Sequence, residues 1–350
     1  MEDLFKKGIL FLRKIKPTDK ILLVYHKDLD GLASGVIFSR IMKKLNLRVS
    51  KKFASSNEEI EKIRKCAKKF DKIIVLDVDI SYMKKELVKM KKDILIVDHH
   101  PPKINLNTKR IVYINPRLKN PKIYQPTSYI TYKFFSRICR LKNEKWLAVL
   151  GTISDFGFAD CKDLLKELRI KKKEDILKTR SWKEVEKIIG TISEIGFRKT
   201  FELMEKANTL KEFKKNKIVK KALKNYFKKI KECEEIFWKN LKEYKEANLL
   251  ISEIKTKHRE ITSLISTKMS GKFSEKVLVV LRKVGKKYAV HARYNGSVEI
   301  NLGKIMEKCA KGLNGGGGHP NAAGASIKEK NKKIFEKRLI EELSRFFNKK

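Results

Sequence analysis

The stretch ILIVDHHPP, residues 94–102, joins a run of four aliphatic residues to three consecutive titratable ones. The run Ile94–Val97 has the length and composition of a buried β-strand. Asp98, His99 and His100 follow at its carboxyl end. Polar groups of this kind are costly to bury unless each has a partner. The stretch therefore predicts a strand that delivers three polar side chains to one point, either exposed or gathered around a charged species.

The sequence on either side alternates short apolar strands with helices. Strands are expected at 21–25, 72–77 and 110–114, and helices at 32–45, 58–70, 82–92, 128–141 and 144–152. This alternation indicates a mostly parallel sheet that is covered by helices on both faces. In such a sheet, the functional site lies at the carboxyl ends of the strands.

The pattern changes twice beyond this region. Residues 163–246 are helical and lysine-rich, and apolar residues at helical spacing from Val219 through Phe227 to Tyr244 predict a long connecting helix. Strands return at 249–254, 276–281 and 288–294. We therefore predict an α/β protein in three parts: a mostly parallel-sheet catalytic domain at 1–160, a lysine-rich helical connector at 161–246, and a smaller α+β C-terminal domain at 247–350.

Composition limits the class of protein. The chain has 350 residues, with 84 basic and 41 acidic side chains and a net charge of +43, which favours a polyanionic partner. An AT-rich genome or the charged surface of a thermophile is the alternative cause of the many lysines. No apolar run reaches about 18 residues, so no membrane span is expected. Five scattered cysteines without a CxxC pair are typical of a reducing cytoplasm and argue against a cysteine zinc site.

Four polar groups follow apolar segments in the predicted catalytic domain. They are His26-x-Asp28-x-Asp30-Gly31, Asp77, Asp98-His99-His100 and Asp155. Because residues two apart in an extended segment point the same way, His26, Asp28 and Asp30 are expected to converge. Each group alone has a structural explanation, such as an N-capping aspartate or a turn residue. Because parallel strands bring their carboxyl ends together, we expect all four groups to meet.

Carboxylates concentrated in this way repel one another unless cations are present. Oxygen and imidazole donors without a thiolate fit manganese or magnesium better than structural zinc. Two divalent ions placed a few ångströms apart commonly activate water against a phosphate. The sequence therefore predicts two divalent ions, with Mn²⁺ preferred and Mg²⁺ possible, balanced by four carboxylates: Asp28, Asp30, Asp77 and Asp155.

These motifs together resemble the DHH phosphoesterase family. The His26 to Gly31 segment resembles the first family motif, Asp77 in VLDVD the second, VDHHPP the third, and LGTISD at 150–155 the fourth. GGGGHPNAAG at 315–324 resembles the signature of the DHH-associated C-terminal domain. The resemblance covers residues 20–330 and is closest to the branch that holds RecJ-type single-strand exonucleases, archaeal RecJ-like nucleases and nanoRNase/pAp phosphatases.

The resemblance implies a role for each motif residue. It implies one metal held by His26, Asp28 and Asp77, and a second held by Asp30, Asp77, His99 and Asp155, so that Asp77 bridges the two. Asp98 would orient the neighbouring histidine. His100 would contact the scissile phosphate and stabilise developing charge, so Asp98 and His100 are the catalytic candidates.

The glycine cluster is the second candidate site. Four consecutive glycines allow backbone N–H groups to approach an anion closely, and His319 could add a donor. A flexible linker is the alternative. Arg293 shares a strand face with Ala289 and His291, suits bidentate contact with a phosphate, and occupies the position of the family's substrate arginine. The predicted substrate-binding residues are Arg293, Gly315, Gly316, Gly317, Gly318 and His319.

These observations favour a metal-dependent phosphodiesterase that hydrolyses single-stranded DNA or RNA to nucleoside 5′-monophosphates, with replication or repair proteins as possible partners. The charge favours a polymer, because phosphate contacts gain from counterion release. One alternative is a phosphoesterase acting on pAp, short oligoribonucleotides or cyclic dinucleotides. Another is a non-catalytic nucleic-acid-binding replication accessory, which the complete set of metal-binding positions disfavours. Residues 211–230, with nine lysines and one glutamate, are either a solvated helix face or a surface that follows phosphates.

Overall fold

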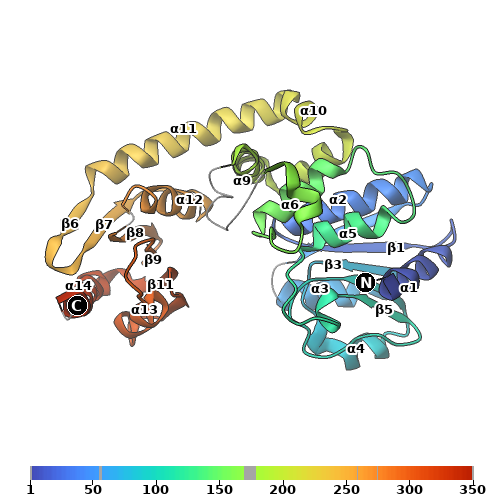
Figure 1. Cartoon of the computed structure of the whole chain (residues 1–350), viewed down its shortest axis with the longest axis horizontal. Coiled ribbons are helices and arrows are strands. Elements are labelled where there is room, and N and C mark those ends of the chain that lie inside the picture. The colour runs from blue at the N-terminus through green and yellow to red at the C-terminus, as the bar shows by residue number, and fades with distance from the viewer. Residues whose placement is uncertain (1, 55–56, 169–178, 258, 274, 349–350) are drawn as a thin grey trace. The chain divides into compact units, whose positions relative to one another are not determined.

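The computed structural model describes residues 2–54, 57–168, 179–257, 259–273 and 275–348. The chain divides into two compact units, Met1–Leu223 and Lys224–Lys350, shown in Figure 1. Residues 169–178 of the predicted connector lie outside the described residues. Among the described helices, none is both long and apolar enough to cross a lipid bilayer.

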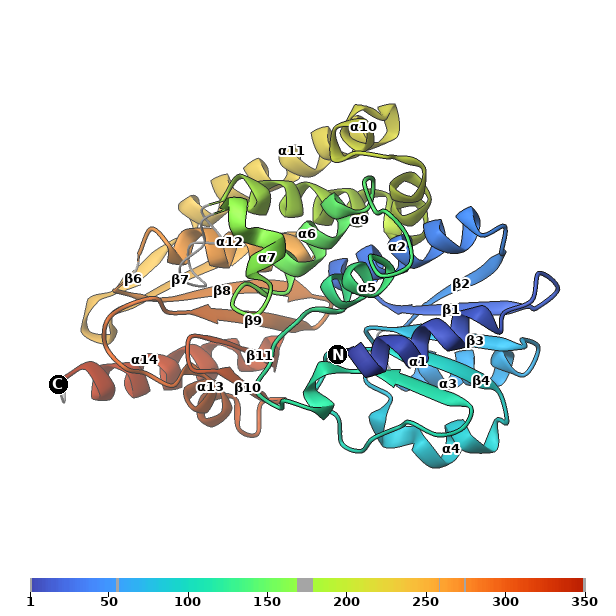
Figure 2. The same cartoon turned by 45° about the vertical axis from the view of Figure 1, so that its right-hand side comes forward.

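The first unit is built on a five-stranded, fully parallel sheet with strand order β2-β1-β3-β4-β5. Figure 2 labels β1 to β4, and Figure 1 labels β5. Four of its strands are the short aliphatic runs that the sequence predicts. The fifth, β2, has the polar sequence VSKKFA and was not predicted; it lies at the edge of the sheet, where burial is lower. The strands are β1 Ile21–His26, β2 Val49–Ala54, β3 Lys72–Leu76, β4 Asp93–Val97 and β5 Ile111–Ile114.

Helices cover both faces of this sheet, which confirms the predicted architecture. Alternate strand residues such as Leu23, Ile74 and Leu95 pack under α1, α2, α5, α6 and α9, while Leu22 and Ile73 face α3 and α4. The helices are α1 Glu2–Arg13, α2 Leu29–Lys44, α3 Asn57–Ala67, α4 Lys84–Lys89, α5 Thr127–Phe135, α6 Lys145–Ser154, α7 Lys162–Leu165, α9 Arg180–Lys206 and α10 Leu210–Lys215. Three short 3₁₀ turns lie among them, at Ser81–Met83, Pro116–Leu118 and Lys166–Leu168.

The register of the sheet positions the site. Four consecutive strands are aligned at one level through Tyr25, Leu76, Val97 and Ile114. The next residues of β1, β3 and β4 are therefore at one edge: His26, Asp77 and Asp98. The parallel ladder continues past the strand ends, since the Asp77 N–H donates to the Val97 carbonyl at 3.0 Å.

One predicted helix is shorter in the structure. Residues 128–141 were expected to be helical, but α5 ends at Phe135. The Ser136 N–H still donates to the Tyr132 carbonyl, but the next two N–H groups, of Arg137 and Ile138, bond only three residues back, to Phe134 and Phe135, so the chain leaves the α-helical pattern there.

The second unit holds a six-stranded mixed sheet with strand order β10-β11-β9-β8-β7-β6. Its inner strands are again aliphatic, and α13 and α14 cover one face while α12 and the end of α11 cover the other. The elements are β6 Lys242–Tyr244, β7 Leu249–Ile254, α12 Arg259–Ser270, β8 Val277–Val284, β9 Lys287–Arg293, α13 Leu302–Ala310, β10 Gly316–His319, β11 Ala322–Lys328 and α14 Lys332–Asn348, with 3₁₀ turns at Lys245–Ala247 and Glu329–Asn331.

The sequence predicts a long helix here, and α11, Lys217–Lys239, contains the boundary between the two units. The extension of its apolar stripe to Tyr244 was wrong, because the helix ends at Lys239 and Tyr244 lies in β6. Its buried side includes Tyr226, Ile230, Cys233 and Phe237, which pack in the core with α12. The assignment of Phe227 to this apolar stripe was wrong, because Phe227 is 42% exposed. At 3.6 residues per turn it lies about 100° around the helix from Tyr226 and so leaves the buried side.

Candidate active site

The first motif combines a strand end with a helix cap. Strand β1 ends at His26, and Asp28 is the N-cap of α2, where its Oδ1 accepts the Gly31 N–H at 2.8 Å. Its Oδ2 lies 2.6 Å from His26 Nδ1. The prediction of an extended segment was wrong at Asp30, which lies in the first turn of α2. Gly31 permits this sharp entry, since a Cβ there would lie 2.5 Å from the His26 carbonyl oxygen.

Asp77 is at the centre of the cluster. Its φ of +63° is unusual for a residue with a side chain and is a local strain that the surrounding structure must maintain. Its Oδ2 lies 3.7 Å from His26 Nδ1, and its Oδ1 lies 3.3 Å from His99 Nε2. The Thr127 hydroxyl donates to the same Oδ1 at 2.9 Å. Asp77 therefore links the first and third motifs.

Asp30 is held by the start of α5. Its two carboxylate oxygens accept the backbone N–H groups of Thr127, at 2.7 Å, and Ser128, at 3.0 Å. These are donors that no helix carbonyl can satisfy, and the positive end of the helix dipole favours the charged carboxylate there. The sequence-distant α5 thus orients a carboxylate of the first motif.

Asp155 follows α6 and faces His99. Its Oδ2 lies 3.5 Å from His99 Nε2 and accepts the Tyr124 hydroxyl at 2.6 Å. The Tyr124 ring meets the His99 ring edge-on, with centroids 5.4 Å apart. Tyr124 therefore contacts both a carboxylate and a histidine of the cluster.

Asp98 pairs with His100 rather than with His99. Its Oδ1 lies 2.7 Å from His100 Nδ1, and Tyr113 donates to its other oxygen at 3.4 Å. Asn115 donates to both the Tyr113 hydroxyl and the His100 carbonyl, at 2.8 and 2.9 Å. Asp98 is 1% exposed, so this buried chain of hydrogen bonds fixes the His100 ring.

The predicted ligands gather into groups of three. Within each group, the potential ligand atoms lie within 4.8 Å of one another. The three groups are His26–Asp28–Asp77, Asp30–His99–Asp155 and Asp77–His99–His100. The first two groups contain all six predicted metal-binding residues, and the third connects them.

The glycine cluster of the second unit is largely a strand. Gly316–His319 forms β10, the outermost strand of the sheet, paired antiparallel with β11. Gly315 and Gly318 have φ values of +103° and +139°, and a Cβ on Gly316 would lie 2.7 Å from the Met306 carbonyl oxygen. The glycines therefore allow a backbone shape and a close contact with α13 that other residues would obstruct, and His319 is exposed.

Arg293 ends β9 and lies in register with His319 across β11. Ala322 pairs with both Arg293 and His319, so the two are separated by about two strand spacings, or roughly 10 Å. The Arg293 guanidinium donates to the Ala292 carbonyl at 2.9 Å. No carboxylate in the described ranges lies within ion-pair distance of it. The structure thus brings Arg293 and the end of β10 onto one sheet level.

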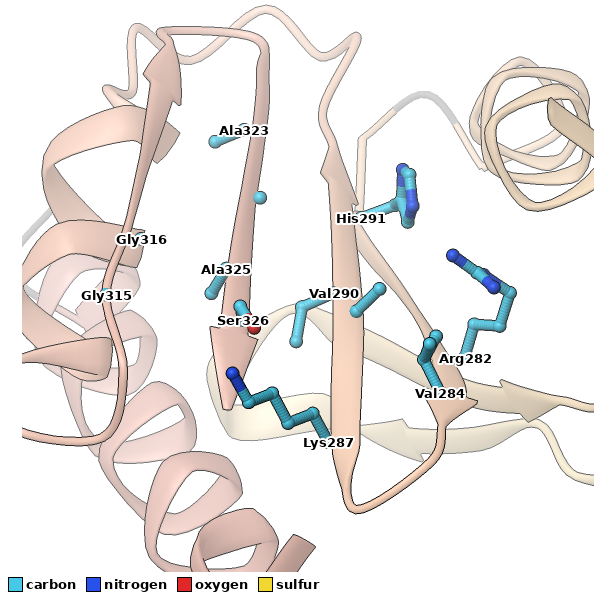
Figure 3. A pocket seen from close by; sticks show the side chains of 12 residues that line it. Arg282, Val284, Lys287, Val290, His291, Gly315, Gly316, Ala323, Ala325 and Ser326 are labelled. Carbon is cyan, nitrogen blue, oxygen red and sulfur yellow. The ribbon is translucent and has the colours of Figure 1, made fainter. Parts of the chain in front are cut away.

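A shallow pocket of about 630 Å³ lies on this same sheet. Figure 3 shows its lining, with His291 of β9 and Arg282 of β8 near each other and Lys287 at the far end of β9. The lining includes Gly315 and Gly316 but neither Arg293 nor His319. The predicted substrate-binding residues therefore extend beyond the pocket. The carboxylate cluster belongs to the other unit.

Comparison with known proteins agrees with the motifs. Residues 20–153 match the family model described as the DHH family, N-terminal domain, and residues 246–349 match the DHHA1 domain. The chain belongs to the DHH family. The predicted class, a metal-dependent hydrolase of this family, is confirmed with that assignment. No curated protein matches the sequence.

Solved structures share the fold over 93–98% of this chain. RecJ from Thermus thermophilus, solved with Mn²⁺, has 16% identity and a TM-score of 0.67 over 98% of this chain, which spans only 55% of that protein. Another exonuclease RecJ bound to manganese has 16% identity and a TM-score of 0.68, with 98% and 94% of the two chains covered. A pGpG-specific phosphodiesterase from Vibrio has 16% identity and a TM-score of 0.53, covering 93% and 99%. These likenesses confirm the predicted fold class.

The electrostatics of the DHH-family cluster favour bound cations. Burial raises the pKa values of Asp30 and Asp77 well above the usual range, and neighbouring carboxylates raise them further. Burial also raises the pKa of Asp155 to about 6, against the Tyr124 hydrogen bond. Burial works on Asp28 too, but its contacts with His26 leave that pKa lowered. Divalent ions would relieve this repulsion, and the oxygen and imidazole donors suit Mn²⁺ or Mg²⁺.

The two histidines of the DHH motif have opposite tendencies. Burial and the neighbouring His100 lower the pKa of His99 to about 4, so its imidazole is neutral near pH 7, the form that binds metals. The hydrogen bond to Asp98 raises the pKa of His100 despite its partial burial. The pKa of Asp98 is lowered, because its contacts with His100 outweigh its burial. The two adjacent histidines therefore favour different protonation states, neutral for His99 and protonated for His100.

Sequence reasoning missed the residues that hold the cluster in place. Thr127 and Ser128 follow Pro126 at the start of a predicted helix, which is a recognisable N-terminal signal, but nothing in the sequence connected that helix end to Asp30. Tyr124 and Asn115 lie in loops and carried no signal. Thr127 and Tyr124 have partners 97 and 31 residues away, which only the fold reveals. Asn115 bonds to the nearer Tyr113 and His100.

Proposed function

We propose that the protein is a manganese-dependent phosphodiesterase of the exonuclease type, acting on single-stranded DNA or RNA and releasing nucleoside 5′-monophosphates. One observation carries the proposal. Two groups of three ligands, His26–Asp28–Asp77 and Asp30–His99–Asp155, meet where His99 Nε2 lies 3.3 Å from Asp77 Oδ1. This pattern suits two adjacent divalent ions that share Asp77.

The ligand roles follow from this grouping. His26, Asp28 and Asp77 would hold one ion, and Asp30, Asp77, His99 and Asp155 the other. Bound divalent ions would supply an activated water and would stabilise negative charge on the phosphate. The surrounding donors from α5 and Tyr124 keep the carboxylates oriented in the folded chain.

His100 would serve the phosphate rather than a metal. Its Nδ1 is engaged by Asp98, which fixes the ring and leaves Nε2 as the donor for a phosphate oxygen. The raised pKa of His100 favours its protonated form, which is the better donor to developing charge. Asp98 acts through His100 as a positioning residue.

The DHHA1 unit would bind the nucleotide. Arg293 offers a planar, two-pronged donor to a phosphate and already lacks a carboxylate partner within the described chain. Gly315, Gly316, Gly317 and Gly318 leave room for an anion beside the backbone, and His319 adds an exposed donor.

A polymeric substrate is supported by the charge of the chain and by its likeness to RecJ. A net charge of +43 attracts a polyanion, and each phosphate contact gains from counterion release. The scattered cysteines support a cytoplasmic location for this activity.

A small-substrate phosphoesterase is the second candidate. The chain covers 99% of the pGpG-specific phosphodiesterase, whose length it therefore nearly matches. The same metal cluster and arginine would serve a dinucleotide, so chemistry alone does not separate the two candidates.

A digestion series with manganese tests the proposal. End-labelled single-stranded DNA, single-stranded RNA, duplex DNA, pAp and pGpG are incubated with metal-stripped protein before and after Mn²⁺ is added. We expect manganese-dependent release of 5′-mononucleotides from the single strands. Turnover of pAp or pGpG without turnover of the longer strands would replace the proposal with the second candidate. Absence of turnover on every substrate would reject both.

A further inference from the structure

Helix α11 carries side-chain charges of only one sign over its first fifteen residues, unlike the other long helices. From Lys217 to Lys231 there are seven lysines and no acidic residue. Six of them lie within an arc of about 100° and along about 21 Å of the helix, on the side opposite the buried residues. We call these six exposed residues the lysine stripe: Lys217, Lys220, Lys221, Lys224, Lys228 and Lys231.

The other long helices of the protein are also lysine-rich, but their charges alternate in sign. Helix α9 has six basic and five acidic residues, with ion pairs such as Lys187–Glu184 at 2.9 Å. Helix α14 has five basic and three acidic residues, with the pair Lys332–Glu336 at 3.6 Å. A lysine-rich composition therefore does not by itself produce a stripe of one sign.

The lysine stripe does little for the fold. Within the described ranges, only Lys228 of the six forms an ion pair, at 4.0 Å from the exposed Glu232, and such a pair contributes little. Lys214, just before the helix, behaves differently, since it lies 2.8 Å from the buried Glu184. Like charges three and four residues apart destabilise a helix, and lysines in the first turn oppose its dipole. The stripe therefore favours a polyanion outside the fold.

Two exposed aromatic residues lie along one edge of the lysine stripe. Phe227 is 42% exposed and Trp238 is 45% exposed. With Lys231 they form one row, at spacings of four and seven residues. Lys272 lies over the Trp238 ring, 5.3 Å from its centroid, and adds another cation to this edge. Surfaces that bind single strands combine a basic track for phosphates with aromatic rings for unpaired bases.

We propose that α11 is a docking surface for the sugar–phosphate backbone of single-stranded nucleic acid, in addition to the metal cluster and the DHHA1 residues. The lysine stripe would follow the phosphates, while Phe227 and Trp238 would stack on bases. A duplex fits less well, because its bases are already stacked inside. The proposal rests on the proposed function only in that the docked strand is the substrate.

Binding without turnover tests the lysine stripe. Anisotropy of labelled oligodeoxythymidine and oligouridine is measured in EDTA over a series of salt concentrations. Lys217, Lys221, Lys224 and Lys228 are changed together to Gln, and Lys85, Lys89, Lys333 and Lys337, exposed on α4 and α14, are changed to Gln as the control.

We expect the stripe variant to bind about tenfold or more weakly at low salt, with a log–log salt slope reduced by roughly 0.7 for each phosphate that a lysine no longer neutralises. The control should keep the wild-type slope. Equal slopes for the wild type and the stripe variant, or equal weakening in both variants, would overturn the proposal. The two oligonucleotides distinguish a DNA-binding surface from an RNA-binding one.

The stacking role of Phe227 and Trp238 can be tested separately from the lysine stripe. Trp238 is the most exposed of the three tryptophans, so stacking should quench the fluorescence of the protein when a single strand is added. Phe227→Ala and Trp238→Ala should each weaken single-strand binding about fivefold or more, with little effect on duplex binding. Equal weakening for single and double strands would contradict the stacking role.

Hydrolysis of a dinucleotide in Mn²⁺ separates this inference from the proposed function. The stripe variant should hydrolyse the dinucleotide at the wild-type rate, because a dinucleotide has too few phosphates to follow the lysine stripe. A wild-type protein that binds strands through the stripe but hydrolyses nothing would reject the proposed function and keep the docking surface. Equal salt slopes for the wild type and the stripe variant, together with intact hydrolysis, would reject the docking surface and keep the proposed function.

Discussion

The carboxylate cluster of the first unit and the glycine-bearing sheet edge of the second differ in burial and in how many hydrogen bonds their side chains already make within the chain. In the cluster, Asp30, Asp77 and Asp98 are at most 2% exposed, and each has named hydrogen-bond donors in the folded chain. At the sheet edge, Gly318 and His319 are exposed, and Arg293 donates only to its neighbouring carbonyl among the described partners.

This difference distinguishes residues that are held in position for chemistry from residues that remain available to bind a ligand. The residues suited to chemistry are oriented before any ligand arrives, which is what electrostatic preorganisation requires. The residues suited to binding keep their donors available for a ligand. Variants in the first region should therefore change metal content and turnover, while variants in the second should change substrate affinity.

The largest effect is expected at Asp77. Asp77→Asn removes a charge from the position that both ligand groups share, so turnover in Mn²⁺ should fall by about 10³-fold or more. Elemental analysis should show less bound manganese. The control is Asp93→Asn, because Asp93 lies at the opposite end of β4 and pairs with Lys72 at 2.6 Å. Near wild-type turnover in Asp77→Asn would remove the shared-ligand role.

A second variant addresses the binding region. Arg293→Ala should raise KM by about 10- to 100-fold, the weight of a charge-assisted phosphate contact, while the manganese content stays at the wild-type level. Arg293→Lys should recover only part of the affinity, since an ammonium cannot bind in two-pronged fashion. Loss of metal in either variant would erase the distinction between the two regions.

Tyr124→Phe probes how the cluster is oriented. It removes the hydroxyl that donates to Asp155 at 2.6 Å and keeps the ring against His99. Outer hydrogen bonds of this kind typically change metal affinity by about 10-fold or more. Manganese titration followed by electron paramagnetic resonance should show one weakened site of the two. Tyr132→Phe on α5 is the matched control, and equal affinities in the two variants would discount Tyr124 as a positioning residue.

The smallest effect concerns stability without metal. An aspartate whose folded pKa is raised stabilises the protein below its unfolded pKa, and that contribution is lost as the pH rises through the folded value. Asp77 is such a residue. In EDTA at about pH 8, Asp77→Asn should therefore unfold several degrees above the wild type, and the gap should shrink toward pH 5. If the two unfolding temperatures are equal, or if their difference widens at low pH, the charged Asp77 carboxylate does not destabilise the metal-free protein.

Much of the fold could be predicted from the sequence, because the aliphatic runs that become β1, β3, β4 and β5 are short and clearly bounded. The site residues next to those strands could be named for the same reason. The edge strands β2 and β10 could not, since VSKKFA is polar and GGGH carries almost no side chains. Phe227 was assigned to the buried stripe because hydrophobicity alone does not distinguish a core position from an exposed aromatic edge.

The prediction that His26, Asp28 and Asp30 lie in one extended segment was also wrong, and the reason is physical. The alternation rule for strands was applied past His26, where α2 already begins. As a result, the capping Asp28 contacts His26, whereas Asp30 in the first turn of the helix groups with His99 and Asp155. The hydrogen bonds from Thr127 and Tyr124 join segments that are 31 to 97 residues apart in the chain, so no local sequence pattern contains them.

The candidate ligands of the cluster come from four separate segments, between His26 and Asp155. An ion held there would join these segments as a covalent cross-link would, because unfolding requires them to separate and releases the ion. The supply of a divalent ion that binds there would then affect abundance as well as activity, since the metal-poor protein opens more often and is degraded faster. In a cell short of that ion, this chain would be lost to proteolysis before it accumulated in the metal-free form.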